Sequence, residues 1–159
     1  MANLEATFTP ALTFVINNRE VLFSKADARV SSLFLWHAVE EIEHRSSAHA
    51  IFETVVGDTS YRMKKTPSLA RHLKGFFALI DAEFAKHVPA HDLTAGMKKP
   101  PKGLGKVPLR DKLALPLSLA KCLAHGHDPA REMPPAWFDT WMREHQEGSD
   151  MTRFYGTQD

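Results

Sequence analysis

Residues 33–52 read LFLWHAVEEIEHRSSAHAIF, and this stretch decides the fold that we expect for the whole chain. Around it, apolar residues recur at the i, i+3, i+4 and i+7 spacing of one helix face. These apolar residues are Val30, Leu33, Phe34, Ala48, Ile51, Phe52 and Val55. Through the middle of the stretch, the same face meets His37, Glu41 and His44, with Glu40 beside them. We therefore expect one helix whose core-facing side carries two imidazoles and at least one carboxylate.

This polar group on an apolar face indicates a bound metal. A carboxylate taken out of water is costly unless a cation or a hydrogen-bond partner replaces the water. Glu41-x-x-His44 has the spacing with which helical bundles bind di-iron or di-manganese centres, and His37 adds a donor one turn earlier. Imidazole and carboxylate together suit iron, manganese or zinc. The residues alone leave an alternative open, in which His37 and His44 each pair with a glutamate one turn away and no metal binds.

Composition limits the class of protein. The 159 residues suffice for one domain, and 43% hydrophobic with 25% charged residues is typical of a soluble globular chain. A net charge of +1 offers no general attraction for nucleic acid. We expect no membrane span, because no run of 18 apolar residues occurs, and no leader is expected at the start. The single cysteine, Cys122, fits a reducing compartment, so a cytoplasmic protein is predicted.

The remaining pattern predicts an all-α chain in one domain. No alternating strand pattern occurs. Within the domain we expect a bundle part with the metal motif over residues 1–95, a basic Pro/Gly loop over 96–110, and C-terminal helices over 111–159. The expected helices cover 4–23 with a weak point at Pro10, about 28–56 capped by Asp27, 69–88 opened by Pro67, 111–125 interrupted by Pro116, and about 135–146.

Two further features are interpreted as structural. Cys122 lies in a Leu/Ala-rich run, which favours a buried and inert thiol. His125-Gly126-His127 precedes Asp128-Pro129 and is interpreted as a turn. It is not taken as a second metal site, because no cysteine or third donor was recognised nearby.

Residues 36–45, WHAVEEIEHR, resemble the hallmark run Trp-His-x-x-Glu-Glu-x-Glu-His-Lys of the family called predicted metal-dependent hydrolases. Only the last position differs, where Arg45 replaces lysine. The resemblance extends more weakly from about Leu4 to the region of Trp137. The family is similar to ferritin-like di-metal proteins, and its His-x-x-x-Glu-x-x-His also resembles the p-aminobenzoate N-oxygenase type of di-iron enzyme.

The resemblance implies roles for individual residues. Glu41 and His44 correspond to metal ligands and His37 to a further ligand. Glu5 is the best candidate for the lone glutamate of the preceding helix, although Ala6 stands where the family has histidine. Glu40 is the candidate catalytic-site residue that orients a ligand imidazole. The implied cofactor is a divalent metal, with iron first and manganese or zinc as alternatives, acting on a small-molecule substrate.

Relatives of this kind begin with two earlier helices, which supply another glutamate and another Glu-x-x-His. This chain carries no second Glu-x-x-His. The resemblance therefore implies a partial ferritin-like bundle without its first two helices and with extra C-terminal helices. The site would be incomplete, or completed by a second copy, or the true start would lie upstream. A homodimer is expected, because symmetric pairing is common and an uncovered apolar face favours association.

Three functions follow as hypotheses. The first is a metal-dependent enzyme, a hydrolase of ferritin-like type. The second is a di-iron oxygenase or oxidase with the same ligands. The third is a non-catalytic, truncated helical protein that binds partners. Nucleic-acid binding through the basic loop is not expected, since the chain is nearly neutral.

Overall fold

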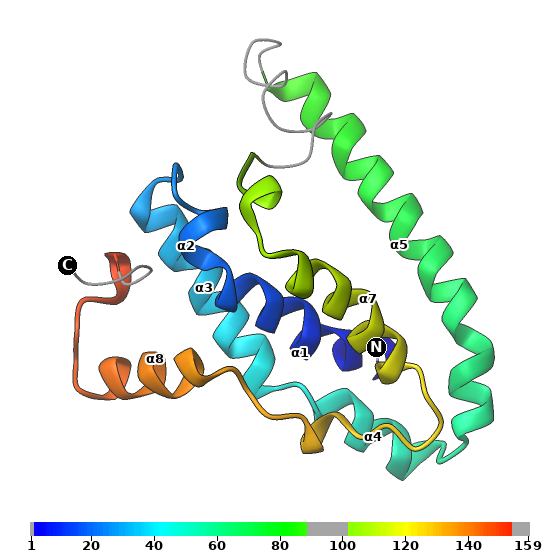
Figure 1. Ribbon diagram of the computed structural model, residues 1–159. Helices are drawn as coiled ribbons and strands as arrows, with labels where there is room; N and C mark the ends of the chain where they lie inside the picture. Colours follow the sequence, from blue (N-terminus) through cyan, green and yellow to red (C-terminus); the bar gives the residue numbers. More distant parts are fainter. Residues whose placement is uncertain (1, 89–101, 154–159) are drawn as a thin grey trace.

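The computed structural model describes residues 2–88 and 102–153 (Figure 1). Within these ranges all regular structure is helical and no strand occurs, so the all-α prediction is confirmed. The α-helices are α1 (Ala2–Asn17), α2 (Arg19–Leu22), α3 (Ala28–Glu43), α4 (Ser47–Val55), α5 (Thr59–His87), α7 (Leu109–Cys122) and α8 (Ala136–Gln146). The short 3₁₀ turns are η1 (Lys102–Lys106), η2 (Pro129–Arg131) and η3 (Met151–Arg153).

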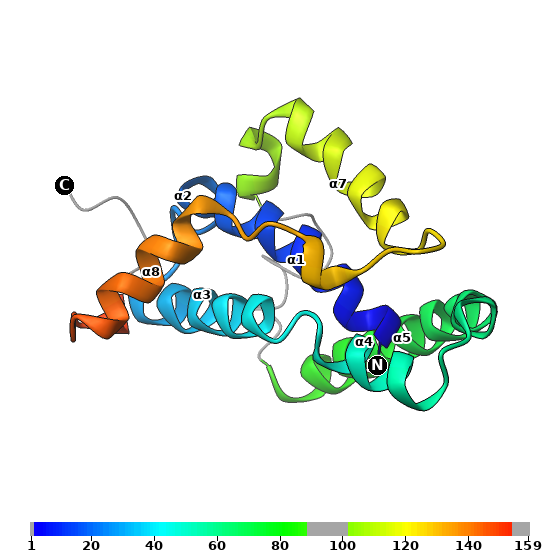
Figure 2. The same ribbon diagram turned by 90° about the horizontal axis from the view of Figure 1, so that it is seen from below.

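Helix α1 is the central element. It contacts α3, α4, α5 and α7, and Figure 2 shows it lying between α7 and α3. The core forms where α1 meets α3, around the buried side chains of Ile16, Leu35, Ala38 and Ile42. Trp137 and Phe138 of α8 pack against this cluster, so the C-terminal helix closes one side of the α1–α3 contact.

The side of α3 that packs on α1 is not the side that the sequence predicts. Its buried residues are Ser31, Ser32, Leu35, Ala38, Val39 and Ile42. Val30, Leu33 and Phe34 are each more than half exposed. We call the surface formed by Val30, Leu33, Phe34, His37, Glu41 and His44 the motif face. The prediction that the motif face lies against the core of this chain is wrong, because α3 has two apolar sides and periodicity does not tell which of them α1 covers.

The predicted helix over 28–56 is divided in two. Asp27 caps α3 as predicted, since its Oδ1 accepts from the backbone N–H of Arg29 at 2.9 Å. Helix α3 then ends at Glu43 and α4 begins at Ser47. Oε2 of Glu5, on α1, accepts from the N–H of Ala48 at 2.8 Å. The backbone N–H groups in the first turn of a helix have no partner within that helix. Glu5 of α1 accepts from one of them and thereby stabilises the start of α4.

Helix α5 begins ten residues earlier than the predicted start at 69 and passes through Pro67. Proline lacks the N–H that would bond the carbonyl four residues before it. In this turn, Nδ2 of Asn3 donates to the Arg62 carbonyl at 2.9 Å and to the Thr66 hydroxyl at 3.1 Å. Helix α1 therefore supports the α5 turn that precedes the proline. The N-cap is Asp58, whose Oδ1 accepts from the N–H of Tyr61 at 3.0 Å.

Two more prolines lie inside helices. Pro10, where the sequence predicts a weak point, is within α1. Pro116 is within α7 and does not interrupt it, contrary to the prediction. The first helix instead ends before Asn18, a buried residue whose Nδ2 donates to the Phe14 carbonyl at 2.9 Å. The last predicted helix is confirmed as α8.

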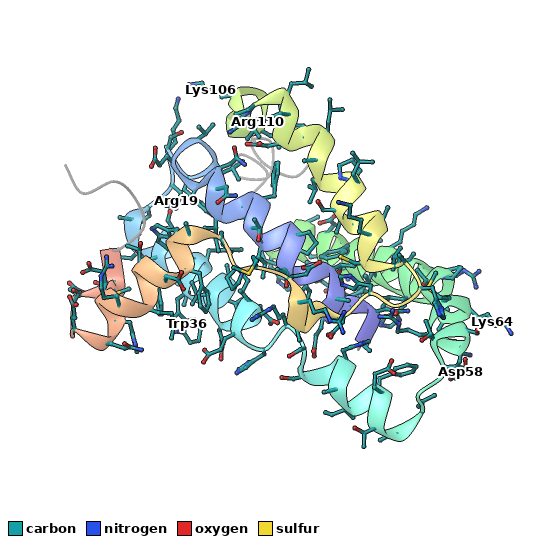
Figure 3. The ribbon with its side chains drawn as sticks, turned by 60° about the horizontal axis from the view of Figure 1, so that its bottom comes forward. Arg19, Trp36, Asp58, Lys64, Lys106 and Arg110 are labelled. Carbon is teal, nitrogen blue, oxygen red and sulfur yellow. The ribbon has the colours of Figure 1, made fainter. Side chains whose placement is uncertain are left out.

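Of the predicted loop over 96–110, residues 96–101 lie outside the described residues. The described part forms η1, which contacts α2, and then the start of α7. Gly103 is required there, because a Cβ at this position would lie 2.5 Å from the carbonyl oxygen of Val21. Figure 3 shows Lys106 and Arg110 at the opposite end of the molecule from Trp36, so these basic residues do not flank the motif face.

Many large apolar side chains are exposed in the described part of the chain. No helix among residues 2–88 and 102–153 is both long and apolar enough to cross a membrane. Exposed apolar side chains beyond the motif face gather on α5 and α7 and include Phe76, Phe77, Leu79, Phe84, Leu109, Leu113 and Leu117.

Candidate metal centre

The imidazole of His37 lies between two carboxylates on α3. Its Nδ1 is 3.7 Å from Oε2 of Glu40, and its Nε2 is 3.6 Å from Oε1 of Glu41. The positions three and four residues on are the helical neighbours of His37, so the helix itself produces this arrangement. The His37 side chain is 58% exposed, and Glu41 is half-buried. The pair is thus organised by one helix and open to the outside.

The His37–Glu41 spacing fits a shared cation. Nitrogen and oxygen donors bound at about 2.0–2.2 Å to a tetrahedral metal lie about 3.3 Å apart. The observed 3.6 Å is close to that value. His44 is the exposed C-cap residue of α3 and follows Glu41 by three residues. In the described part of the chain, His37, Glu41 and His44 do not by themselves form a three-donor group ready for one ion. The motif face therefore presents an open set of donors.

Glu5 is positioned as a helix cap. One of its oxygens is bonded to the N–H of Ala48, as described above. The residue lines an open hollow of about 520 Å³ with Ala48, Ile51, Phe52 and Val55 of α4. The structure brings Glu5 to the start of α4, immediately after the motif, but gives no contact between Glu5 and His37 or Glu41.

A second hollow lies at the other end of α3. It has a volume of about 450 Å³ and is lined by Val30, Leu33 and Trp36 of α3, with Met151 and Thr152 of η3. The indole of Trp36 neighbours the His37 ring, with centroids 6.5 Å apart. Along the chain, His37, Glu41 and His44 thus fall between two apolar hollows.

Sequence reasoning missed a second group of donors. Cys122, at the end of α7, meets His127 and Glu132, and one ligand atom from each lies within 4.8 Å of the other two. The region forms the predicted turn, but the prediction that no cysteine or third donor lies near His127 is wrong. The signal was the spacing Cys-x₄-His-x₄-Glu, which brings its members together only because the chain reverses at Gly126, with φ +77°.

Burial dominates the electrostatics of this second group. Burial, with a smaller contribution from the charge of Glu132, raises the pKa of the Cys122 thiol to about 12. Burial also lowers the pKa of His127, against the opposing effect of Glu132 and with the help of Arg62 and His49. Cys122 is buried, as predicted, and is a protonated thiol at neutral pH rather than a nucleophile.

The motif and its surroundings also match a family model. The model described as "Predicted metal-dependent hydrolase" covers residues 1–111, which include Glu5 and the whole of the 36–45 run. No curated protein and no solved structure matches the chain. Cys122, His127 and Glu132 lie beyond the matched residues. Because the match spans more than half of the sequence, the chain belongs to the predicted metal-dependent hydrolase family.

Proposed function

We propose that the protein is a metal-dependent hydrolase whose metal is held at the motif face by His37, Glu41 and His44. The observation that carries the proposal is the His37–Glu41 pair, with donor atoms 3.6 Å apart, inside the region that matches the hydrolase family. Iron is the first candidate and manganese or zinc the next, because imidazole and carboxylate donors suit all three. The substrate is a small molecule.

Each residue of the motif has a distinct role in this proposal. Glu40 faces Nδ1 of His37 and would orient the ring so that Nε2, which lies near Glu41, is available to hold a metal. Glu40 is thus a positioning residue. When bound, the metal would lower the pKa of a water molecule and polarise the bond to be hydrolysed. Trp36 and Leu33 line the adjoining hollow of about 450 Å³, where an apolar part of a substrate can rest.

We further propose that a second copy of the chain completes the site. The motif face places polar donors among Val30, Leu33 and Phe34, all exposed. Neighbouring exposed apolar side chains of this kind are typical of interaction sites. A symmetric pair would bring two sets of His37, Glu41 and His44 to a shared interface.

The test is metal content in purified protein from iron-replete cells. The background variant Cys122→Ser removes any contribution from the only thiol. In this background we expect stoichiometric metal in the parent and its loss in Glu41→Ala and His44→Ala. Glu43→Ala is the matched control, because Glu43 is an exposed carboxylate on α3 outside the motif face and its removal should leave the metal in place. Hydrolysis of a panel of esters and amides should follow the metal content.

A non-catalytic, partner-binding role is the competing function, and the open arrangement of the donors favours it. That role predicts a parent protein without metal and without activity, and the hydrolase proposal would then be abandoned. Metal that survives both Glu41→Ala and His44→Ala would equally contradict it, since the ion would then be held elsewhere.

A further inference from the structure

The buried group at the end of α7 has the composition and spacing of a second metal site. Oε1 of Glu132 lies 3.7 Å from Sγ of Cys122 and 3.6 Å from Nε2 of His127. Around a tetrahedral zinc, a sulfur and an oxygen ligand lie about 3.5 Å apart, and a nitrogen and an oxygen ligand about 3.3 Å. Glu132 therefore lies within a few tenths of an ångström of these spacings from both partners. The ligand atoms of Cys122 and His127 lie within 4.8 Å of each other and would have to approach to share one ion.

Burial leaves one polar atom of this group without a hydrogen-bond partner. Nε2 of His127 is inaccessible to water and has no hydrogen-bond partner. Cys122 is 1% exposed, and its thiol reaches the Ser118 carbonyl at 3.2 Å and Glu132. A buried polar atom without a partner costs stability, and a cation at this point would give His127 a partner and Glu132 a counter-charge.

We propose that Cys122, His127 and Glu132 form a zinc site that is separate from the motif face. Thiolate with imidazole and carboxylate selects zinc over the harder cations such as magnesium and calcium. Three protein ligands leave a fourth position. A hollow of about 360 Å³ between α1 and α7 is lined by Glu132, Ser118 and Lys121, so a water molecule can reach the group from that side.

The placement of the three donors would let one ion link successive segments of the chain, with a water molecule as its fourth ligand. Cys122 ends α7, His127 follows the turn at Gly126, and Glu132 follows η2, so one ion would tie together the whole connection toward α8. That connection runs beside buried residues of α4 and α5, since both His49 and Arg62 are close enough to affect the pKa of His127. Arg62 is 3% exposed, and its positive charge opposes a cation, so we expect the affinity to rest chiefly on the zinc–thiolate bond.

Cobalt titration of the metal-stripped, reduced full-length chain tests the site without reference to activity. A cobalt–thiolate bond gives a charge-transfer band in the near ultraviolet. The sequence contains a single cysteine, so such a band can arise only from Cys122. We expect the band in the parent protein, its displacement by zinc, and a zinc-dependent rise in melting temperature.

Variants decide whether the other two donors take part. His127→Ala and Glu132→Gln should each weaken cobalt binding about tenfold or more. His125→Ala is the matched control: His125 is exposed in the same turn and its removal should leave binding unchanged. Helical circular dichroism shows whether each variant is folded. The proposal is overturned by absence of the band in the folded parent, or by parent-like binding in both His127→Ala and Glu132→Gln. The motif-face variants Glu41→Ala and His44→Ala should keep the band, which separates this outcome from that of the hydrolase proposal.

Discussion

Nε2 of His37 lies 3.6 Å from Oε1 of Glu41 on the outer side of α3, while Nδ1 of the same ring faces Glu40 at 3.7 Å. Both contacts are formed within one helix, so the donors are arranged before any partner binds. Exposed ion pairs of this kind contribute little to stability. Removing the His37 imidazole should therefore weaken metal binding and leave the folding stability nearly unchanged.

The first prediction concerns His37→Ala. We expect the free energy of unfolding of the metal-free protein to change by less than about 0.5 kcal/mol, because the His37 side chain is 58% exposed. Copurified metal should fall together with activity. Urea unfolding in EDTA and metal analysis measure the two effects. A large loss of stability in EDTA would instead give His37 a structural role.

The second prediction concerns the motif face as a dimer interface. Leu33→Lys should convert a dimer of twice 17.9 kDa into a monomer, because it places a charge in the middle of an apolar contact. Leu79→Lys is the matched control, since Leu79 on α5 is 61% exposed against 63% for Leu33. Sedimentation or light scattering gives the mass. A parent protein that is monomeric at high concentration contradicts the dimer and leaves another segment or partner to cover this face.

The third prediction tests whether Glu5 acts as a helix cap or as a metal ligand. Because Oε2 caps α4 at Ala48, Glu5→Ala should destabilise the protein by about 1 kcal/mol even in EDTA. Glu5→Gln keeps an acceptor oxygen and should lose less. If Glu5 acts only as a metal ligand, both substitutions will leave the EDTA-treated protein unchanged and affect only metal content.

The fourth prediction uses the two glycines of η1. Gly103→Ala should cost about 1–3 kcal/mol, because the new Cβ would lie 2.5 Å from the Val21 carbonyl oxygen and η1 would have to move away from α2. Gly105→Ala adds a methyl group with nothing within 4 Å, so its effect should stay within about 0.5 kcal/mol. Thermal and urea unfolding compare them, and equal effects would contradict the close approach of η1 to α2.

The fifth prediction concerns the guanidinium beside the second metal site. Arg62→Met removes a buried positive charge that acts on Cys122 and His127, so cobalt should bind more tightly by on the order of tenfold. The cobalt–thiolate band reports the affinity. Weaker binding in a folded Arg62→Met protein would mean that Arg62 supports the group instead of opposing the cation.

Much of the fold followed from local patterns. Helical periodicity predicted an all-α chain, and Asp27 marked the start of α3 because a carboxylate satisfies the free N–H groups of a first turn. The effects of proline were predicted less well. Pro10, Pro67 and Pro116 all lie inside helices, and at Pro67 a donor from α1, Asn3, supports the turn before it. Such support comes from residues distant in sequence, so local rules cannot supply it.

The candidate sites likewise combine features that the sequence predicts with features that depend on the tertiary structure. The sequence by itself determined that His37, Glu41 and His44 share one face of α3 with Val30 and Leu33, because the 3.6-residue period of the helix requires it. Only the tertiary structure decided that α1 packs on the opposite face of α3, through Leu35, Ala38 and Ile42. Only the reversal of the chain at Gly126 brought Cys122, His127 and Glu132 together. Spacing orders residues along one helix, whereas contacts between helices and across turns depend on which surfaces pack together to bury apolar area.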